Sequence, residues 1–67
     1  MKLYAPEIKT LIELCKDRIA ANTQEQRKAA EAGRWEEAKD LQLRSEYIDS
    51  IRETLQTELT KQLNSIQ

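Results

Sequence analysis

The sequence predicts an all-α protein: an antiparallel two-helix hairpin that pairs with a second copy into a four-helix bundle. Apolar residues recur at spacings of three and four along two long segments, which is the period of a helix. The single glycine, Gly33, lies between those segments, at the kind of position where a helix ends. A chain of 67 residues buries only a modest core, so we expect self-association to complete it.

The first helix is predicted over residues 6–31. Pro6 suits the first helical position, and Glu7 after it complements the helix dipole. The apolar stripe comprises Ile8, Leu11, Ile12, Cys15, Ile19, Ala29 and Ala30, and it continues through the polar residues Asn22 and Gln26. These two polar residues indicate either a wet section where the helices splay or a polar contact that fixes register or oligomeric state.

A corner at residues 32–34 leads to a second predicted helix over residues 35–65, with Glu36 and Glu37 in its first turn. Its main apolar stripe comprises Ala38, Leu41, Ile48, Leu55, Leu59, Leu63 and Ile66, with Ser45, Arg52 and Gln62 interrupting it. Three acid–base pairs at helical spacing, Asp40–Arg44, Asp49–Arg52 and Glu58–Lys61, are expected on a solvated side. The whole chain, residues 1–67, is predicted to be one domain.

A second apolar row, Leu43, Tyr47 and Ile51, adjoins the main stripe of the second helix. Together the two stripes span roughly half of the helix circumference, which is more than one partner helix covers. We therefore expect this row to be an outer contact surface, covered by a second copy or by a foreign protein. A single long bent helix that pairs between chains is the alternative architecture.

Composition limits the other classes of function. Eleven basic and twelve acidic residues nearly cancel, so no long-range field draws the chain to nucleic acid or to an anionic membrane. No apolar run approaches the roughly 18 residues of a membrane span, and the N-terminus lacks a signal-peptide core. We expect a soluble, cytoplasmic protein.

No catalytic residue, metal ligand or cofactor site is predicted. The chain has no histidine, and its one cysteine, Cys15, lies on an apolar stripe where cysteine serves as a small core residue. The carboxylates stand beside lysines and arginines along exposed helical faces, where no enclosed pocket is expected to perturb them. We therefore expect a protein that is not an enzyme.

Trp35 and four basic residues cluster near the corner. The basic residues are Arg27, Lys28, Arg34 and Lys39, and with Trp35 they are the residue types that contact phosphates and stack on bases. Acidic neighbours offset this charge, namely Glu25, Glu31, Glu36 and Glu37. The sequence favours a structural role, in which the Trp35 ring closes the end of the hairpin over Ala29 and Ala30.

The corner also resembles a known motif. The run from Ala29 to Leu41, Ala-Ala-Glu, three residues, Trp-Glu-Glu-Ala, two residues, Leu, resembles the UVR motif, a helical hairpin of the excision-repair proteins UvrB and UvrC and of some regulators of protease chaperones. The resemblance implies that the matching residues Ala29, Ala30, Trp35, Glu36, Ala38 and Leu41 make the contacts of a hairpin that docks against a like hairpin or a partner protein. The run departs from that family at Gly33 and at Gln42-Leu43.

Three functions are compatible with these features. The leading one is a non-enzymatic adaptor or inhibitor that acts as a homo-oligomer and binds an unidentified protein through Leu43, Tyr47, Ile51 or Trp35. The first alternative is a helical oligomer that sequesters a small molecule or nucleotide, with Tyr4, Trp35 or Tyr47 and nearby arginines lining the pocket. The second is nucleic-acid binding through the basic corner.

Overall fold

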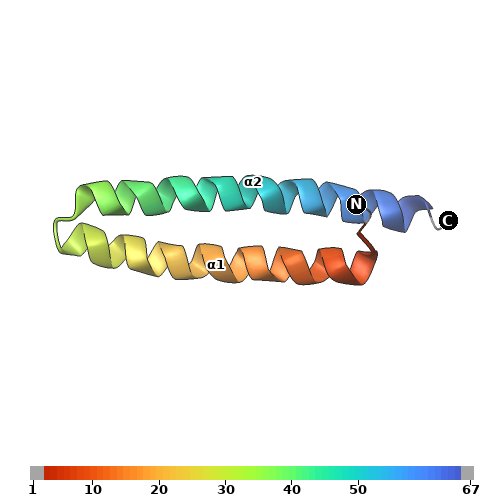
Figure 1. Cartoon of the computed structure of the whole chain (residues 1–67), viewed down its shortest axis with the longest axis horizontal. Coiled ribbons are helices and arrows are strands. Elements are labelled where there is room, and N and C mark those ends of the chain that lie inside the picture. Colours follow the sequence, from red (N-terminus) through yellow and green to blue (C-terminus); the bar gives the residue numbers. More distant parts are fainter. Residues whose placement is uncertain (1–2, 66–67) are drawn as a thin grey trace.

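Two long helices account for nearly all of the chain in the computed structural model, which describes residues 3–65. Helix α1 covers Ala5–Glu31 and helix α2 covers Trp35–Ser65, joined by a corner at residues 32–34 (Figure 1). The sequence had placed them at 6–31 and 35–65. The predicted all-helical fold of two helices packed against each other is confirmed for the described residues. Ile66, assigned to the main apolar stripe of the second helix, lies outside them.

Helix α1 begins without a side-chain cap. The backbone of Tyr4 is extended, its side chain makes no capping hydrogen bond, and its carbonyl oxygen accepts the first helical bond from the Ile8 N–H at 3.0 Å. Pro6 lies in the first turn, where its missing N–H costs nothing because the first N–H groups of a helix have no partner within it. Glu7 adds a negative charge at the positive end of the helix dipole.

The corner is a compact helix ending built on Gly33. Gly33 has a φ of 77°, in the left-handed region that glycine adopts without steric cost. Its N–H donates to the Ala30 carbonyl at 3.0 Å, and the Arg34 N–H donates to the Ala29 carbonyl at 2.8 Å. These two bonds are those of the Schellman motif, and they satisfy carbonyl groups that the end of α1 would otherwise leave free. The chain reverses direction here, so α2 runs back along α1.

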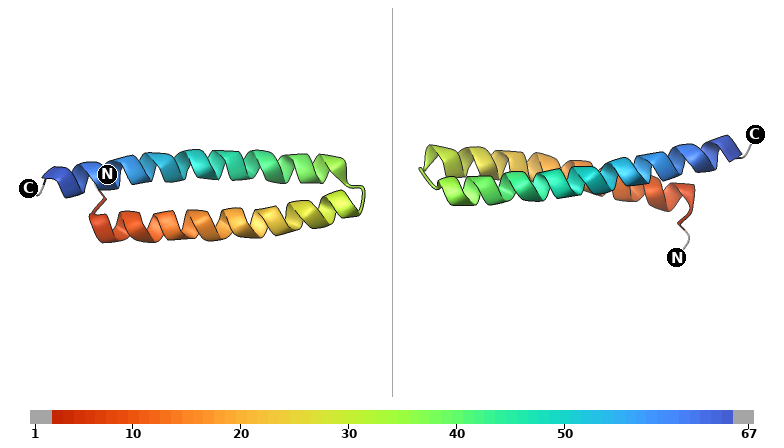
Figure 2. Two further views of the ribbon diagram at one scale, coloured as in Figure 1. Left: turned by 180° about the vertical axis from the view of Figure 1, so that it is seen from behind. Right: turned by 90° about the horizontal axis from the view of Figure 1, so that it is seen from above.

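The helices pack along one stripe from each, which we call the seam. On α1 the seam residues are Ile8, Ile12, Cys15, Ile19, Asn22, Gln26 and Ala29, and on α2 they are Ala38, Leu41, Ser45, Ile48, Arg52, Leu55, Leu59 and Gln62. Each of these residues is buried or half-buried, and their spacing alternates strictly between three and four. Seen from above, the two helices cross at a shallow angle along their length (Figure 2).

The best-packed part of the seam lies at the end away from the corner. Ile8, Ile12 and Leu59 form a buried cluster, and Leu3, Ala5 and Leu55 pack against it. Gln62 closes this end, because its Nε2 donates to the carbonyl oxygen of Leu3 at 2.6 Å. Leu63, which the sequence assigned to the main apolar stripe, is 47% exposed. That assignment is wrong, because the alternation from Leu59 places Gln62 on the seam.

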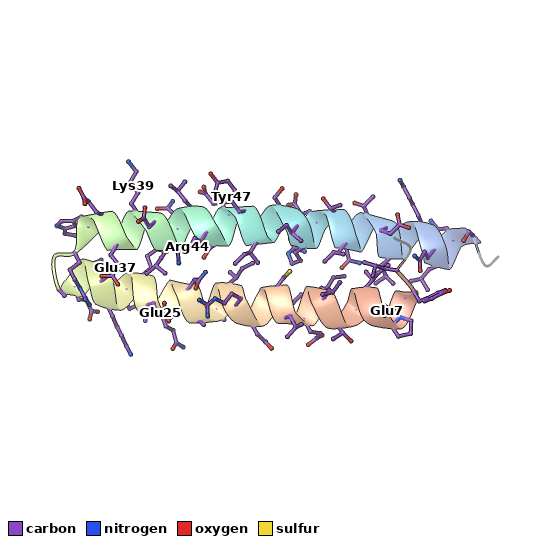
Figure 3. The ribbon with its side chains drawn as sticks, in the orientation of Figure 1. Glu7, Glu25, Glu37, Lys39, Arg44 and Tyr47 are labelled. Carbon is purple, nitrogen blue, oxygen red and sulfur yellow. The ribbon has the colours of Figure 1, made fainter. Side chains whose placement is uncertain are left out.

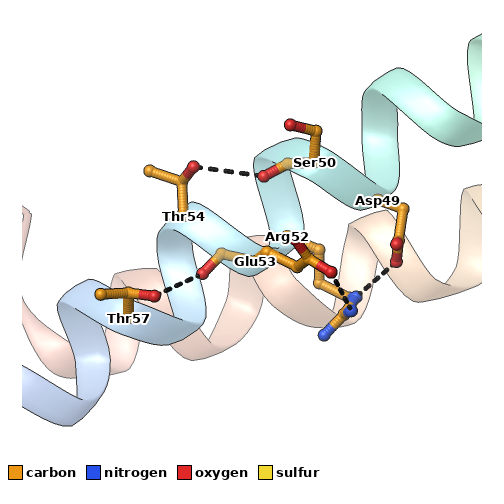
Figure 4. A network of polar contacts seen from close by, with 6 residues as sticks. All are labelled: Asp49, Ser50, Arg52, Glu53, Thr54 and Thr57. Carbon is orange, nitrogen blue, oxygen red and sulfur yellow. Dashed lines mark hydrogen bonds and ion pairs between the residues drawn. The ribbon is translucent and has the colours of Figure 1, made fainter.

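One of the three predicted acid–base pairs forms. Arg52 donates from Nε to Asp49 Oδ1 at 2.9 Å, and its Nη2 lies 4.0 Å from Glu53 (Figure 4). Within residues 3–65 no ion pair joins Asp40 to Arg44 or Glu58 to Lys61. Exposed threonines instead bond to the backbone four residues earlier, as Thr54 does to Ser50 and Thr57 to Glu53.

Candidate protein-docking surface

Four of the eight large apolar side chains that are exposed in the described part of the chain lie on one long side of the hairpin. Both α-helices are right-handed and they run in opposite directions. The residue that directly precedes a seam residue therefore lies on the same long side of the hairpin in both helices. Leu11 directly precedes the seam residue Ile12, and Ile51 directly precedes Arg52. Leu14 and Tyr47 lie three and four residues from them, on neighbouring positions of the same side. We call Leu11, Leu14, Tyr47 and Ile51 the apolar face.

The apolar face is open to solvent in the single chain. Tyr47 is 68% exposed, Leu14 57% and Ile51 55%, and Leu11 is also exposed. The sequence had assigned Leu11 to the stripe that packs against the other helix, and the structure corrects this. Leu11 is adjacent to Ile12, and the seam has room for only one of them.

Sequence reasoning missed Leu14, and it joined Leu43 to the same line as Tyr47 and Ile51. Each step of four residues turns by about 40° around a helix, so Leu43 points about 80° away from Ile51. Leu43 is exposed on the outer side of α2. Tyr47 extends from α2 on the side away from α1 (Figure 3), and Ile51 lies closer to the seam. The strict three-four spacing of the seam could have predicted that Leu14 lies outside the seam. It could also have predicted that Leu43, Tyr47 and Ile51 wind around α2 instead of forming a straight line.

Charged residues border the apolar face in a regular order. Among the residues that directly precede seam positions of α2, Arg44, Ile51 and Glu58 recur at every seventh residue. Neither Arg44 nor Glu58 forms an ion pair with another residue of the described chain. Glu58 accepts only a long hydrogen bond, at 3.4 Å, from Nε2 of Gln62.

The opposite side of the hairpin is polar. It carries the residues that directly follow seam positions, among them Lys9, Lys16, Thr23, Gln42, Asp49 and Gln56, with Leu63 at its far end. The two long sides therefore differ in kind. Among the described residues, large apolar side chains lie in the middle of the side that carries Leu11 and Ile51 and not in the middle of the other side.

The middle of the seam is polar as well. The pKa of Arg52 is raised above its usual value, first by its hydrogen bond to Asp49 and then by the charge of that carboxylate, and Cys15 of α1 adds a small increase. Cys15 and Arg52 lie at the same level of the seam, since each is seven residues nearer the corner than the packed residues Ile8 and Leu59. Seven residues nearer the corner on each helix stand Asn22 and Ser45, whose buried Oδ1 and Oγ atoms have no hydrogen-bond partner. This part of the seam contributes little apolar burial.

At the corner, the side chain of Trp35 is 70% exposed. The expectation that its ring packs over Ala29 and Ala30 is wrong, because α2 begins at Trp35 with the ring directed outward while Ala29 is covered by the other helix. The indole and the residues around it line a shallow hollow with Gly33 and Glu37.

The basic residues expected to act with Trp35 are exposed but not drawn together. Arg34 pairs with Glu37, Nε to Oε2 at 3.3 Å, and so part of its charge is already matched. Arg27 and Lys39 precede and follow the corner on the polar side, whereas Lys28 lies on the other side. Tyr4 stands at the opposite end of the hairpin from Trp35 (Figure 1). One chain therefore does not bring the proposed aromatic and basic ligand contacts into a single pocket.

The described residues contain neither a candidate membrane span nor a candidate metal site. Neither α1 nor α2 contains an apolar stretch that is long enough to cross a membrane. Within residues 3–65 no three histidine, cysteine, aspartate or glutamate side chains are grouped as metal ligands would be.

No protein-family model, no curated protein and no solved structure matches this chain. The buried positions of Ala29, Ala38 and Leu41 lie within the run that resembles the UVR motif, but membership of that family stays a prediction.

Proposed function

We propose that this protein is a small non-enzymatic protein-interaction module that acts as a homo-oligomer, with the apolar face as its docking surface and a second copy as the first occupant. The observation that carries the proposal is that four large apolar side chains, Leu11, Leu14, Tyr47 and Ile51, are exposed on the same long side of the hairpin. A row of this kind on a small chain is typical of an interface.

The composition of the apolar face supports docking. Tyr47 combines a large ring that has few rotatable bonds with a hydroxyl that tolerates water, and such side chains anchor many interfaces. Leu11, Leu14 and Ile51 surround it with aliphatic surface. Charged residues such as Arg44 and Glu58 form the rim, which is the usual arrangement of an apolar centre within a polar border.

The size of the hairpin supports a second copy as occupant. Its Cα extents are 52 × 19 × 14 Å, so one long side is large enough for the roughly 800 Å² that each partner of a standard interface buries. The single chain buries few apolar side chains and leaves the middle of its seam polar. A dimer would bury further apolar side chains at the middle of the hairpin, where the seam itself buries few. It would also give the four-helix bundle expected from the sequence.

We also propose that the protein binds an unidentified protein and so acts as an adaptor or inhibitor. A cytoplasmic location is part of the same proposal, and the free Cys15 is compatible with it. The outer side of α2 with Leu43, and the exposed Trp35 at the corner, are the surfaces that a dimer through the apolar face would leave free for such a partner. No specific observation favours the small-molecule or nucleic-acid alternatives.

Sedimentation velocity of two variants, each with one apolar residue replaced by glutamate, tests the proposal. Tyr47→Glu places a charge on the apolar face, and Leu63→Glu places the same charge on an exposed apolar residue of the opposite side. We expect the wild type and Leu63→Glu to sediment as oligomers and Tyr47→Glu to sediment as a helical monomer. Equal oligomerisation of both variants would refute the assigned face, and a monomeric wild type would refute self-association.

A further inference from the structure

The order Arg44, Ile51, Glu58 along the apolar face is self-complementary. Ile51 lies midway between a cation and an anion, each seven residues away, or about 10.5 Å along the helix. The charges of Arg44 and Glu58 in one chain are therefore roughly 21 Å apart. At that distance salt screens the attraction between them, because the screening length is ~10 Å. Neither has an ion-pair partner within the described chain.

We infer that two copies pair through their apolar faces about a twofold axis at Ile51, with the two α2 helices antiparallel across it. This inference rests on the proposed function and specifies its geometry. The twofold brings Ile51 against Ile51 of the partner subunit and Arg44 against Glu58 of the partner subunit, and the same ion pair occurs twice. Surface charge pairs of this kind select the register of two helices.

The same axis fits the α1 helices. Ile8 packs with Leu59 in the buried cluster, and eight residues toward the corner on each helix puts Ile51 level with residue 16 of α1. A twofold at that level relates residue 11 to 21 and residue 14 to 18. Leu11 then faces the small side chain of Ala21 of the partner subunit, and Leu14 faces the aliphatic stem of Arg18 of the partner subunit. The assembly is a four-helix bundle in which like helices are antiparallel neighbours.

This geometry has one unfavourable feature, which makes it distinguishable from the other face-to-face arrangement. It brings Glu7 level with Glu25 of the partner subunit, so two like charges meet at the rim (Figure 3 labels both residues). A twofold along the hairpin axis would instead set α1 against α2 of the other copy and bring Glu25 beside Arg44 of the partner subunit. Removing the charge of Glu25 therefore has opposite effects in the two arrangements.

Charge exchange tests the inference. Arg44→Glu and Glu58→Lys each convert both intersubunit pairs from attraction to repulsion, so we expect each variant to raise the dimer dissociation constant about tenfold or more. When the two variants are mixed, every intersubunit pair becomes attractive again, as Glu with Lys and as Glu with Arg. Sedimentation equilibrium with one variant labelled should therefore show a heterodimer with the wild-type dissociation constant. Lys16→Glu, on the polar side, is the control and should leave the constant unchanged.

Glu25→Gln provides the second measurement. We expect it to tighten the dimer a few-fold, because it removes a like-charge contact; a weakened dimer would support the arrangement of α1 against α2 and overturn the inferred axis. A dimer that does not respond to Arg44→Glu or Glu58→Lys would also overturn the axis, while self-association itself would stand. A wild type that stays monomeric would refute both the axis and the proposed homo-oligomer.

Discussion

The backbone N–H of Arg34 donates to the carbonyl oxygen of Ala29 at 2.8 Å, across the left-handed turn at Gly33 that reverses the chain. This bond sets where α1 ends, and hence which residue of α2 faces which residue of α1. No atom lies within 4 Å of the position that a Cβ on Gly33 would take, so backbone strain is the only obstacle to a side chain there.

Gly33→Ala should therefore destabilise the hairpin by about 1 kcal/mol, the cost of a left-handed conformation for a residue with a Cβ. Gly33→Asn is the matched control and should cost less, since asparagine tolerates this conformation. Thermal unfolding followed by circular dichroism measures both. Equal stability of Gly33→Ala and the wild type would contradict the turn geometry.

Trp35→Ala should leave the stability within about 0.5 kcal/mol of the wild type, because the ring is exposed. Ile8→Ala is the comparison. Ile8 is fully buried in the cluster with Ile12 and Leu59, so its truncation should cost about 2 to 5 kcal/mol. Urea unfolding of both variants gives the two values. A large loss from Trp35→Ala would mean that the indole packs against the hairpin after all.

Ser45→Ala should stabilise the hairpin by about 1 kcal/mol, because it removes a buried hydroxyl that has no hydrogen-bond partner. Part of any gain comes from the higher helix propensity of alanine, about 0.5 kcal/mol. Ser50→Ala, at an exposed serine of the same helix, measures that part separately. A loss of stability specific to Ser45→Ala would indicate that its hydroxyl bonds to Asn22 across the seam.

The sequence was sufficient for the helices and the corner because these depend on local chemistry. Pro6 favours the first turn of a helix, Gly33 supplies the left-handed residue after one, and the three-four spacing identifies helical stripes. The exact seam was harder to predict, because Leu11 and Ile12, or Gln62 and Leu63, are neighbours that compete for one position. The packing of the whole helix pair decides between them.

The candidate docking surface was predicted only in part. Tyr47 and Ile51 were identified because two apolar stripes on α2 exceed what one helix covers, and both are exposed. The contribution of Leu11 and Leu14 depends on which way α1 is rotated, which only the assembled pair defines. The position of Trp35 depends on the backbone direction at the first residue of α2, which periodicity does not specify.

Cross-linking at Ile51 tests the central claim, pairing of two copies through the apolar face, most directly. In a Cys15→Ser background, Ile51→Cys places a single thiol on the inferred twofold axis, where it meets the same thiol of the other copy. Leu63→Cys places an exposed thiol on the opposite side of the hairpin as the control. With a short thiol-to-thiol cross-linker at micromolar concentration, the account predicts rapid covalent dimers of Ile51→Cys and few of Leu63→Cys. Absence of cross-linking at residue 51, or equal yields at both positions, would contradict it.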